Sequence, residues 1–153
     1  MDSNNIIKVS KSRLVGQVEV SGAKNSALKL LTASILTDEP VEIFQSPNGL
    51  LDMKIHISML ESLGKKCTVG EKYLKIEEIK TLKKELIWEE RSIRNSLLML
   101  GALTTRFGEG RVPLPGGCKI GERKYDVHIK ILEKFGSDVC EEEAYLFAKT
   151  KTG

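Results

Sequence analysis

The sequence predicts an α/β fold built from two copies of one βαβαββ unit. Three observations lead to this prediction. The residues around Asn25 resemble those around Asn95, with a cation before and a serine after each asparagine. Further along, His56 recurs as His128, 72 positions later. Within each copy, short alternating runs typical of strands are interspersed with apolar residues at helical spacing. A period of about 70 residues exceeds that of most solenoid repeats, so each copy should be a compact α/β unit.

The sequence of the first copy contains signals for strands, helices and turns along its whole length. In chain order we expect a strand at 16–20, a helix at 25–35, a strand at 41–44, a helix at 52–63, and a hairpin with strands at 67–69 and 73–76. Pro40 follows the first helix because proline cannot continue it. Gly64 ends the second helix, whose inner stripe is formed by Met53, Ile57, Leu60 and Leu63.

The second copy repeats this order. We expect a strand at 86–88, a helix at 92–107, a strand at 111–114, a helix at 125–135, and a hairpin at 137–148. Each copy has too little apolar surface to be stable alone, so the two should pack with their helices together. Residues 79–90, rich in Lys and Glu, are expected to be a solvated connection between the copies.

Composition narrows the classes of function. A chain of 153 residues with 41% hydrophobic content can bury one core, and no apolar run approaches the roughly 20 residues that span a bilayer. The net charge of +3 does not favour nucleic acid as a partner, but it allows a local basic site for a small anion. The three cysteines have no disulfide or zinc-binding spacing. A reducing cytoplasm is therefore the expected compartment.

Each first helix is predicted to start with a cation, Lys24 in one copy and Arg94 in the other. A helix N-terminus presents free backbone N–H groups and partial positive charge, which suits a phosphate or a carboxylate. An adjacent cation strengthens such a site. The alternative is that the asparagine and serine of each motif only cap the helix.

The segment 113–123 contains the third candidate site. Gly116 and Gly117 give the backbone unusual freedom, and they place Cys118 beside Lys119 and near Arg123. Neighbouring cations lower the pKa of a thiol, so Cys118 could act as a nucleophile or a proton donor. The alternative is a surface cysteine in a glycine turn.

The remaining residues that could take part in binding or catalysis are interpreted as structural. Cys67 and Cys140 fall in the closing hairpins and are expected to be small buried apolar residues. The two histidines occupy one repeat position, so we expect a role in the second helix and no metal site. Trp88 is expected in the core.

Three motifs in this order resemble one family. Residues 21–27 read SGAKNSA, residues 94–96 read RNS, and residues 114–123 read LPGGCKIGER. The chain is similar, from about residue 7 onward, to the UDP-N-acetylglucosamine 1-carboxyvinyltransferase family of enolpyruvyl transferases. The loop cysteine favours this nucleotide-sugar branch over the shikimate-using branch. The resemblance implies transfer of the enolpyruvyl group of phosphoenolpyruvate to the 3′-hydroxyl of UDP-N-acetylglucosamine, with release of phosphate, as the first committed step of peptidoglycan precursor synthesis.

The resemblance also implies roles for particular residues. Cys118 would donate a proton to the enolpyruvyl methylene carbon and could form a covalent adduct. Phosphoenolpyruvate would bind to Lys24, Asn25 and Arg123. The nucleotide sugar would bind to Arg94, Arg123, Lys124, Tyr125, Asp126 and Val127. The family is not known to need a metal or an organic cofactor.

The implied fold is an inside-out α/β barrel of two domains, each with three βαβαββ units and with the active site between the domains. Residues 1–20 would then be a strand segment of the other domain, and 21–153 an incomplete domain with repeat one at 21–78 and repeat two at 85–149. The third unit, the catalytic aspartate and a further substrate arginine would belong to a missing C-terminal portion, which would be this segment's partner in a complete enzyme.

Two alternatives follow from departures from the family pattern. Lys124 stands where the family commonly has proline, so the acceptor could be another uridine nucleotide such as UMP, as in nucleoside-antibiotic synthesis. The length allows a non-catalytic, truncated nucleotide-binding paralogue.

Overall fold

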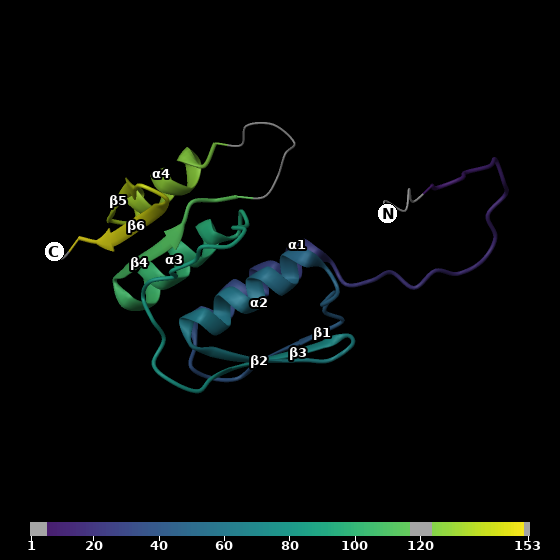
Figure 1. The fold of residues 1–153 in the computed structure, drawn as a ribbon, viewed down its shortest axis with the longest axis horizontal. Coiled ribbons are helices and arrows are strands. Elements are labelled where there is room, and N and C mark those ends of the chain that lie inside the picture. The colour runs from purple at the N-terminus through teal and green to yellow at the C-terminus, as the bar shows by residue number, and fades with distance from the viewer. Residues whose placement is uncertain (1–5, 117–123, 152–153) are drawn as a thin grey trace.

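The computed structural model describes residues 6–116 and 124–151. It contains two units with the same order of elements (Figure 1). The first comprises α1 (Lys24–Ala33), the short 3-10 helix η1 (Ser34–Leu36), β1 (Val41–Phe44), α2 (Leu51–Leu63), β2 (Lys65–Val69) and β3 (Tyr73–Glu78). The second comprises α3 (Ser96–Phe107), β4 (Glu109–Pro113), α4 (Asp126–Lys134), β5 (Ser137–Glu142) and β6 (Tyr145–Thr150). The predicted α/β class and both closing hairpins are confirmed.

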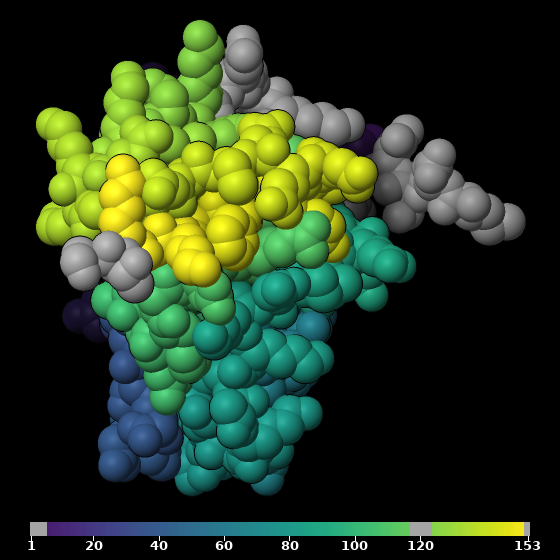
Figure 2. All heavy atoms as spheres, turned by 90° about the vertical axis from the view of Figure 1, so that its left-hand side faces the viewer, coloured from purple at the N-terminus to yellow at the C-terminus, as the bar shows by residue number. Residues whose placement is uncertain are grey.

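Each unit has a three-stranded antiparallel sheet with the same strand order, β1-β3-β2 in the first and β4-β6-β5 in the second. The central strand in each is the last one in the sequence. Ile43 pairs with Leu74 in the first sheet, and Val112 pairs with Leu146 in the second. All four side chains are buried. In Figure 2 the two last strands of the second sheet, β5 and β6 (yellow), lie on the face of the molecule that is turned to the viewer.

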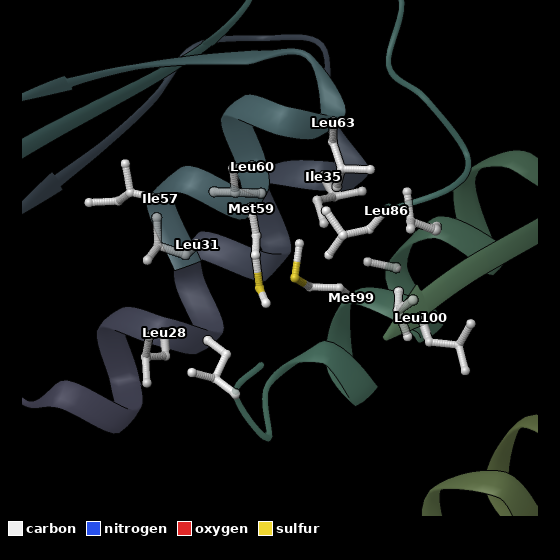
Figure 3. Close-up of a cluster of buried hydrophobic side chains, with 14 of the residues drawn as sticks. Leu28, Leu31, Ile35, Ile57, Met59, Leu60, Leu63, Leu86, Met99 and Leu100 are labelled. Atoms are coloured by element: carbon white, nitrogen blue, oxygen red, sulfur yellow. The ribbon is translucent and has the colours of Figure 1, made fainter. Parts of the chain in front are cut away.

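The core lies between the helices of the two units, as predicted. Figure 3 shows Met59 of α2 and Met99 of α3 meeting at the boundary between the units. Both are fully buried, and the predicted stripe of α2 is buried as well. The charged connector at 79–90 is also anchored in this core, because Leu82 and Leu86 are buried. The prediction of a fully solvated connector is therefore wrong for these two residues.

Two predicted strands do not form. Residues 16–20 have no regular structure, and seven apolar side chains between Ile6 and Val20 are 85–90% exposed. A strand needs a neighbour for its backbone hydrogen bonds, and no described strand pairs with this segment. Residues 86–88 also form no strand, and only Glu85 makes an isolated bridge, to Arg111.

A cluster of charged side chains joins the two units. Arg106 of α3 donates two hydrogen bonds to Glu78 of β3, at 2.6 and 3.1 Å, and one to the carbonyl of Ile35, at 2.8 Å. Lys65 of β2 donates to the same carboxylate at 2.9 Å and to the carbonyl of Thr37 at 2.7 Å. Burial alone would raise the pKa of Glu78, but the hydrogen bonds and charges of Arg106 and Lys65 hold it below its ordinary value.

Candidate functional site

Among the described residues, the four α-helices α1 to α4 run in the same direction, so their N-termini lie at one end of the helix layer. At the far end, Arg106 in the last turn of α3 bonds to the carbonyl of Ile35, directly after α1. At the near end, Lys24 contacts Asp52 at the start of α2, and Arg94 contacts Lys124 just before α4. The packing thus brings the predicted cations Lys24 and Arg94 to the same end of the helix layer.

Lys24 is the first residue of α1, and its ammonium lies 2.8 Å from the Asp52 carboxylate. Asp52 is the acidic residue in the first turn of α2. The next predicted site residue, Asn25, is exposed at the same helix start. Asp52 was not among the residues predicted from the sequence. The sequence did contain a signal for it, because Asp52 is an acidic residue at the start of the second helix of the unit whose first helix starts with the cation Lys24.

In the second unit Arg94 plays the corresponding part. Its Nη2 donates a 3.0 Å hydrogen bond to the carbonyl of Lys124. Its charge also reaches His128, where desolvation and then Arg94 lower the pKa of the imidazole. The predicted site residues Lys124 and Arg94 therefore lie together.

The other predicted nucleotide-binding residues lie at the start of α4. The Tyr125 hydroxyl donates to Glu141 at 2.6 Å, and this bond, together with burial, raises its pKa. Asp126 is exposed and forms an ion pair with Lys130 at 3.7 Å. Val127 is exposed.

The alternative that asparagine and serine only cap the helices is not supported. Ala23 is the N-cap of α1 and Asn95 is the N-cap of α3, and neither helix has a capping hydrogen bond from a side chain. Ser96 is fully buried, and its hydroxyl has no hydrogen-bond partner in the structure. The backbone N–H groups of both helix starts are therefore not occupied by their N-cap side chains.

A close backbone contact supports the helix start in each unit. In the first, a Cβ on Gly22 would lie 1.7 Å from the carbonyl oxygen of Gln45, whose own φ of 56° is left-handed. In the second, a Cβ on Gly116 would lie 2.7 Å from the carbonyl oxygen of Ser92. The two contacts occupy the same place in the repeat. In the first unit the glycine, Gly22, lies before the first helix, whereas in the second unit the glycine, Gly116, lies on the other side of the contact, after β4. The second holds Gly116 beside the segment that leads to Arg94, and α3 begins at Ser96, four residues later than predicted.

Three predicted residues, Cys118, Lys119 and Arg123, lie outside the described residues. Their roles stay predictions. The chain on either side is placed, however, because Gly116 contacts Ser92 and the Lys124 carbonyl is bound by Arg94. Both neighbouring positions therefore lie beside the start of α3.

The other two cysteines, Cys67 and Cys140, have raised pKa values, which favour the protonated thiol. Burial, with a smaller contribution from Glu61, raises the pKa of the half-buried Cys67 to about 12. Cys140 is exposed, so the prediction that it is buried is wrong: its side chain lies on the outward face of β5, where it contacts Glu142 at 3.8 Å. Desolvation and the Glu142 carboxylate raise its pKa.

An apolar groove of about 530 Å³ runs along α1, α3 and α4. Its walls include Leu36, Leu97, Leu98, Ile131 and Leu132, with His128 at one side. It follows the flanks of the helices, and its lining includes none of the predicted substrate-binding residues that the structure describes. The groove therefore has the character of a packing surface.

The described part of the chain contains neither a cluster of metal-ligating side chains nor a membrane-spanning helix. Across 6–116 and 124–151, no three His, Cys, Asp or Glu side chains are grouped as metal ligands would be. No helix within these ranges has the length and apolar content needed to cross a bilayer.

Comparison with known proteins gives a consistent result. UDP-N-acetylglucosamine 1-carboxyvinyltransferase of Blochmanniella pennsylvanica is 44% identical over 140 residues, which cover 88% of this chain and 32% of that protein. UDP-N-acetylglucosamine 1-carboxyvinyltransferase 1 of Carboxydothermus hydrogenoformans is 43% identical over 145 residues, covering 94% and 34%. The chain thus spans about a third of the length of the curated relatives it matches.

A solved structure shares the fold. The enolpyruvyl transferase NikO from Streptomyces tendae superposes with a TM-score of 0.68 at 20% identity, over 91% of this chain and 31% of that one. The profile of the family described as EPSP synthase (3-phosphoshikimate 1-carboxyvinyltransferase) matches residues 9–152. With its duplicated units of the order αβαββ and this match along nearly its whole length, the chain belongs to the EPSP synthase family.

Proposed function

We propose that the chain forms part of an enolpyruvyl transferase that joins the enolpyruvyl group of phosphoenolpyruvate to the 3′-hydroxyl of UDP-N-acetylglucosamine and releases phosphate. The observation that carries the proposal is the position of Lys24 and Arg94 at the starts of parallel helices, at one end of the molecule. The relatives with 39–44% identity over this region support the choice of reaction.

The chemistry requires a concentration of positive charge. Phosphoenolpyruvate carries up to three negative charges, so cations and helix N-termini must converge on it. In the proposal Lys24, Asn25 and Arg123 bind phosphoenolpyruvate. The nucleotide end of the acceptor is bound by Arg94, Arg123, Lys124, Tyr125, Asp126 and Val127.

Cys118 is the proposed proton donor. As the acceptor hydroxyl loses its proton to a base, for which the catalytic aspartate of the missing portion is the candidate, its oxygen bonds to C2 of phosphoenolpyruvate and the Cys118 thiol gives a proton to C3. Loss of phosphate from C2 and of a proton from C3 then restores the double bond in the product. The same thiol could add to C2 and form the covalent adduct.

The remaining parts of the proposed enzyme would cover what this chain leaves exposed. We propose that residues 1–20 pair with another domain and that 21–153 are two units of a three-unit, inside-out barrel. The exposed apolar side chains between Ile6 and Val20 support the first point. The apolar groove and the exposed side chains of Val127 and Ile131 on α4 and of Phe135 directly after it support the second. We place the enzyme in the cytoplasm.

The acceptor can be identified by assay of the complete open reading frame that encodes this chain. Phosphate release from phosphoenolpyruvate would be measured with UDP-N-acetylglucosamine, UMP or shikimate 3-phosphate. We expect release with UDP-N-acetylglucosamine. Release with UMP alone would support the second candidate, which is favoured by Lys124 standing where the family commonly has proline. Binding of nucleotide without release from any acceptor would instead indicate a non-catalytic module.

Thiol labelling tests the role of Cys118. With a limiting alkylating agent at pH 7, we expect Cys118 to react faster than Cys67 and Cys140, because the pKa values of the latter two are raised. Phosphoenolpyruvate with nucleotide sugar should slow the labelling of Cys118, as read by peptide mass spectrometry. Equal rates at all three thiols, with no protection, would contradict the proposed role.

A further inference from the structure

We propose that Asp52 is a positioning residue, whose carboxylate holds the Lys24 ammonium in one orientation at the start of α1. The inference rests on the proposed function, in which Lys24 binds phosphoenolpyruvate. An ammonium group has three N–H donors. With one donated to Asp52, two stay available for an anion.

The geometry supports a defined orientation. The Nζ to Oδ2 distance of 2.8 Å is that of a charge-assisted hydrogen bond. Asp52 lies in the first turn of α2, where the helix dipole stabilises a carboxylate. Lys24 comes from a different helix, 28 residues away, so the contact exists only because α1 and α2 start at the same end.

The pair is poorly suited to stabilising the fold. The side chains of Lys24 and Asp52 are 44% and 30% exposed, and solvent-exposed ion pairs contribute little to stability. The pair does restrict a long, flexible side chain before any ligand arrives. A ligand then does not have to order that side chain itself, which favours binding.

The second unit repeats the arrangement with different chemistry. In the repeat, Lys24 corresponds to Arg94, and Asp52 corresponds to Lys124. Arg94 also contacts its counterpart, through the backbone carbonyl of Lys124 at 3.0 Å. Both units therefore hold the cation of the first helix against the start of the second, although the side chain of Lys124 has the wrong charge to do so. Recurrence of the contact without the carboxylate indicates that the architecture favours this position for the cation.

Asp52→Asn in the 153-residue chain tests the proposal, with Glu109→Gln as the matched control. Glu109 pairs with Lys84 at 2.9 Å and with similar side-chain exposures of 33% and 50%. We expect both variants to unfold at the midpoint of the wild type. The ammonium signal of Lys24 in ¹H–¹⁵N NMR spectra, assigned with Lys24→Arg, should be protected from exchange in the wild type and in Glu109→Gln, and lost in Asp52→Asn.

Titration with phosphoenolpyruvate gives the second measurement. Removing a carboxylate beside a cation should tighten anion binding if only net charge matters. Positioning predicts the opposite, a Kd raised about three- to tenfold in Asp52→Asn and unchanged in Glu109→Gln. Tighter binding by Asp52→Asn, or an unchanged Lys24 signal, would overturn the proposal. The proposed function fails separately, if the enzyme expressed from the complete open reading frame releases no phosphate from phosphoenolpyruvate with any acceptor, while the Lys24 signal would still decide whether Asp52 holds the ammonium.

Discussion

Replacement of Arg106 by methionine is expected to lower the free energy of unfolding by about 3 kcal/mol, because it removes one partner from a mostly buried charged cluster. Arg106 and Glu78 are 19% and 13% exposed, and the Lys65 side chain is almost completely buried. Methionine keeps much of the aliphatic contact. It leaves the carbonyl of Ile35 and one side of the Glu78 carboxylate without their hydrogen bonds.

Chemical denaturation at neutral pH measures this effect. Lys84→Met is the control, since it removes an exposed cation from its pair with Glu109 and should change stability by less than about 1 kcal/mol. Adding Glu78→Gln to Arg106→Met should lower stability further, because the almost completely buried Lys65 ammonium then loses its carboxylate partner at 2.9 Å. A loss below about 1 kcal/mol for Arg106→Met would show that the cluster does not join the two units energetically.

Acidification below pH 6.5 is expected to destabilise the protein through His56. Burial lowers the pKa of His56 to about 4 from an ordinary value of 6.5. The Thr32 hydroxyl donates to the carbonyl of Leu28, so its oxygen accepts from His56 Nε2 at 3.4 Å. The other ring nitrogen, Nδ1, has no hydrogen-bond partner in the structure. A second proton on this ring would therefore be buried without compensation.

The direction of this pH effect on stability follows from the number of protons that the folded and the unfolded chain bind. Above pH 6.5 the ring is neutral in both the folded and the unfolded chain, and its contribution to stability is complete. Between pH 6.5 and 4 the unfolded chain binds a proton that the folded chain does not, so stability falls as the pH falls. The loss from this residue should be about 2 kcal/mol at pH 5 and about 3 kcal/mol at pH 4.

Denaturation curves between pH 7 and 4.5 test the histidine separately from the carboxylates. Glu77, Glu78 and Glu109 have lowered pKa values, so their contributions are lost only as the pH falls through more acidic values. His56→Gln should flatten the dependence in this range, and His128→Gln should leave most of it, because His128 is only partly buried. An unchanged slope in His56→Gln would assign the pH dependence to other groups.

Local sequence signals predicted most of the secondary structure. The helix at 52–63 was identified by its apolar stripe and by Gly64, whose φ of 126° ends the helix as observed. The hairpins were identified by alternation around short turns. These features depend on residues that are neighbours in the chain, so periodicity and backbone preference suffice to find them. The repeat then placed Lys24 and Arg94 at equivalent points.

Local signals failed where a segment depends on a distant neighbour. Residues 16–20 alternate like a strand, yet they form none, because alternation describes a side-chain pattern and a strand also needs a hydrogen-bonding partner. Cys140 also lies at a hairpin position that the sequence could not assign to the inner or outer face. Its exposure depends on how the second sheet packs against α3 and α4.

The sequence by itself determined the repeated unit, the two helix-start cations and the family resemblance, because these are carried by residue type and spacing. Only the tertiary structure decided that the four α-helices of the described residues start at one end and that Lys24 meets Asp52 there. It also decided that Lys65, Glu78 and Arg106 share one cluster. These contacts join residues that are 13 or 28 positions apart. Such partners are selected by the packing of one unit's helices and strands against each other and against the second unit, which no local pattern encodes.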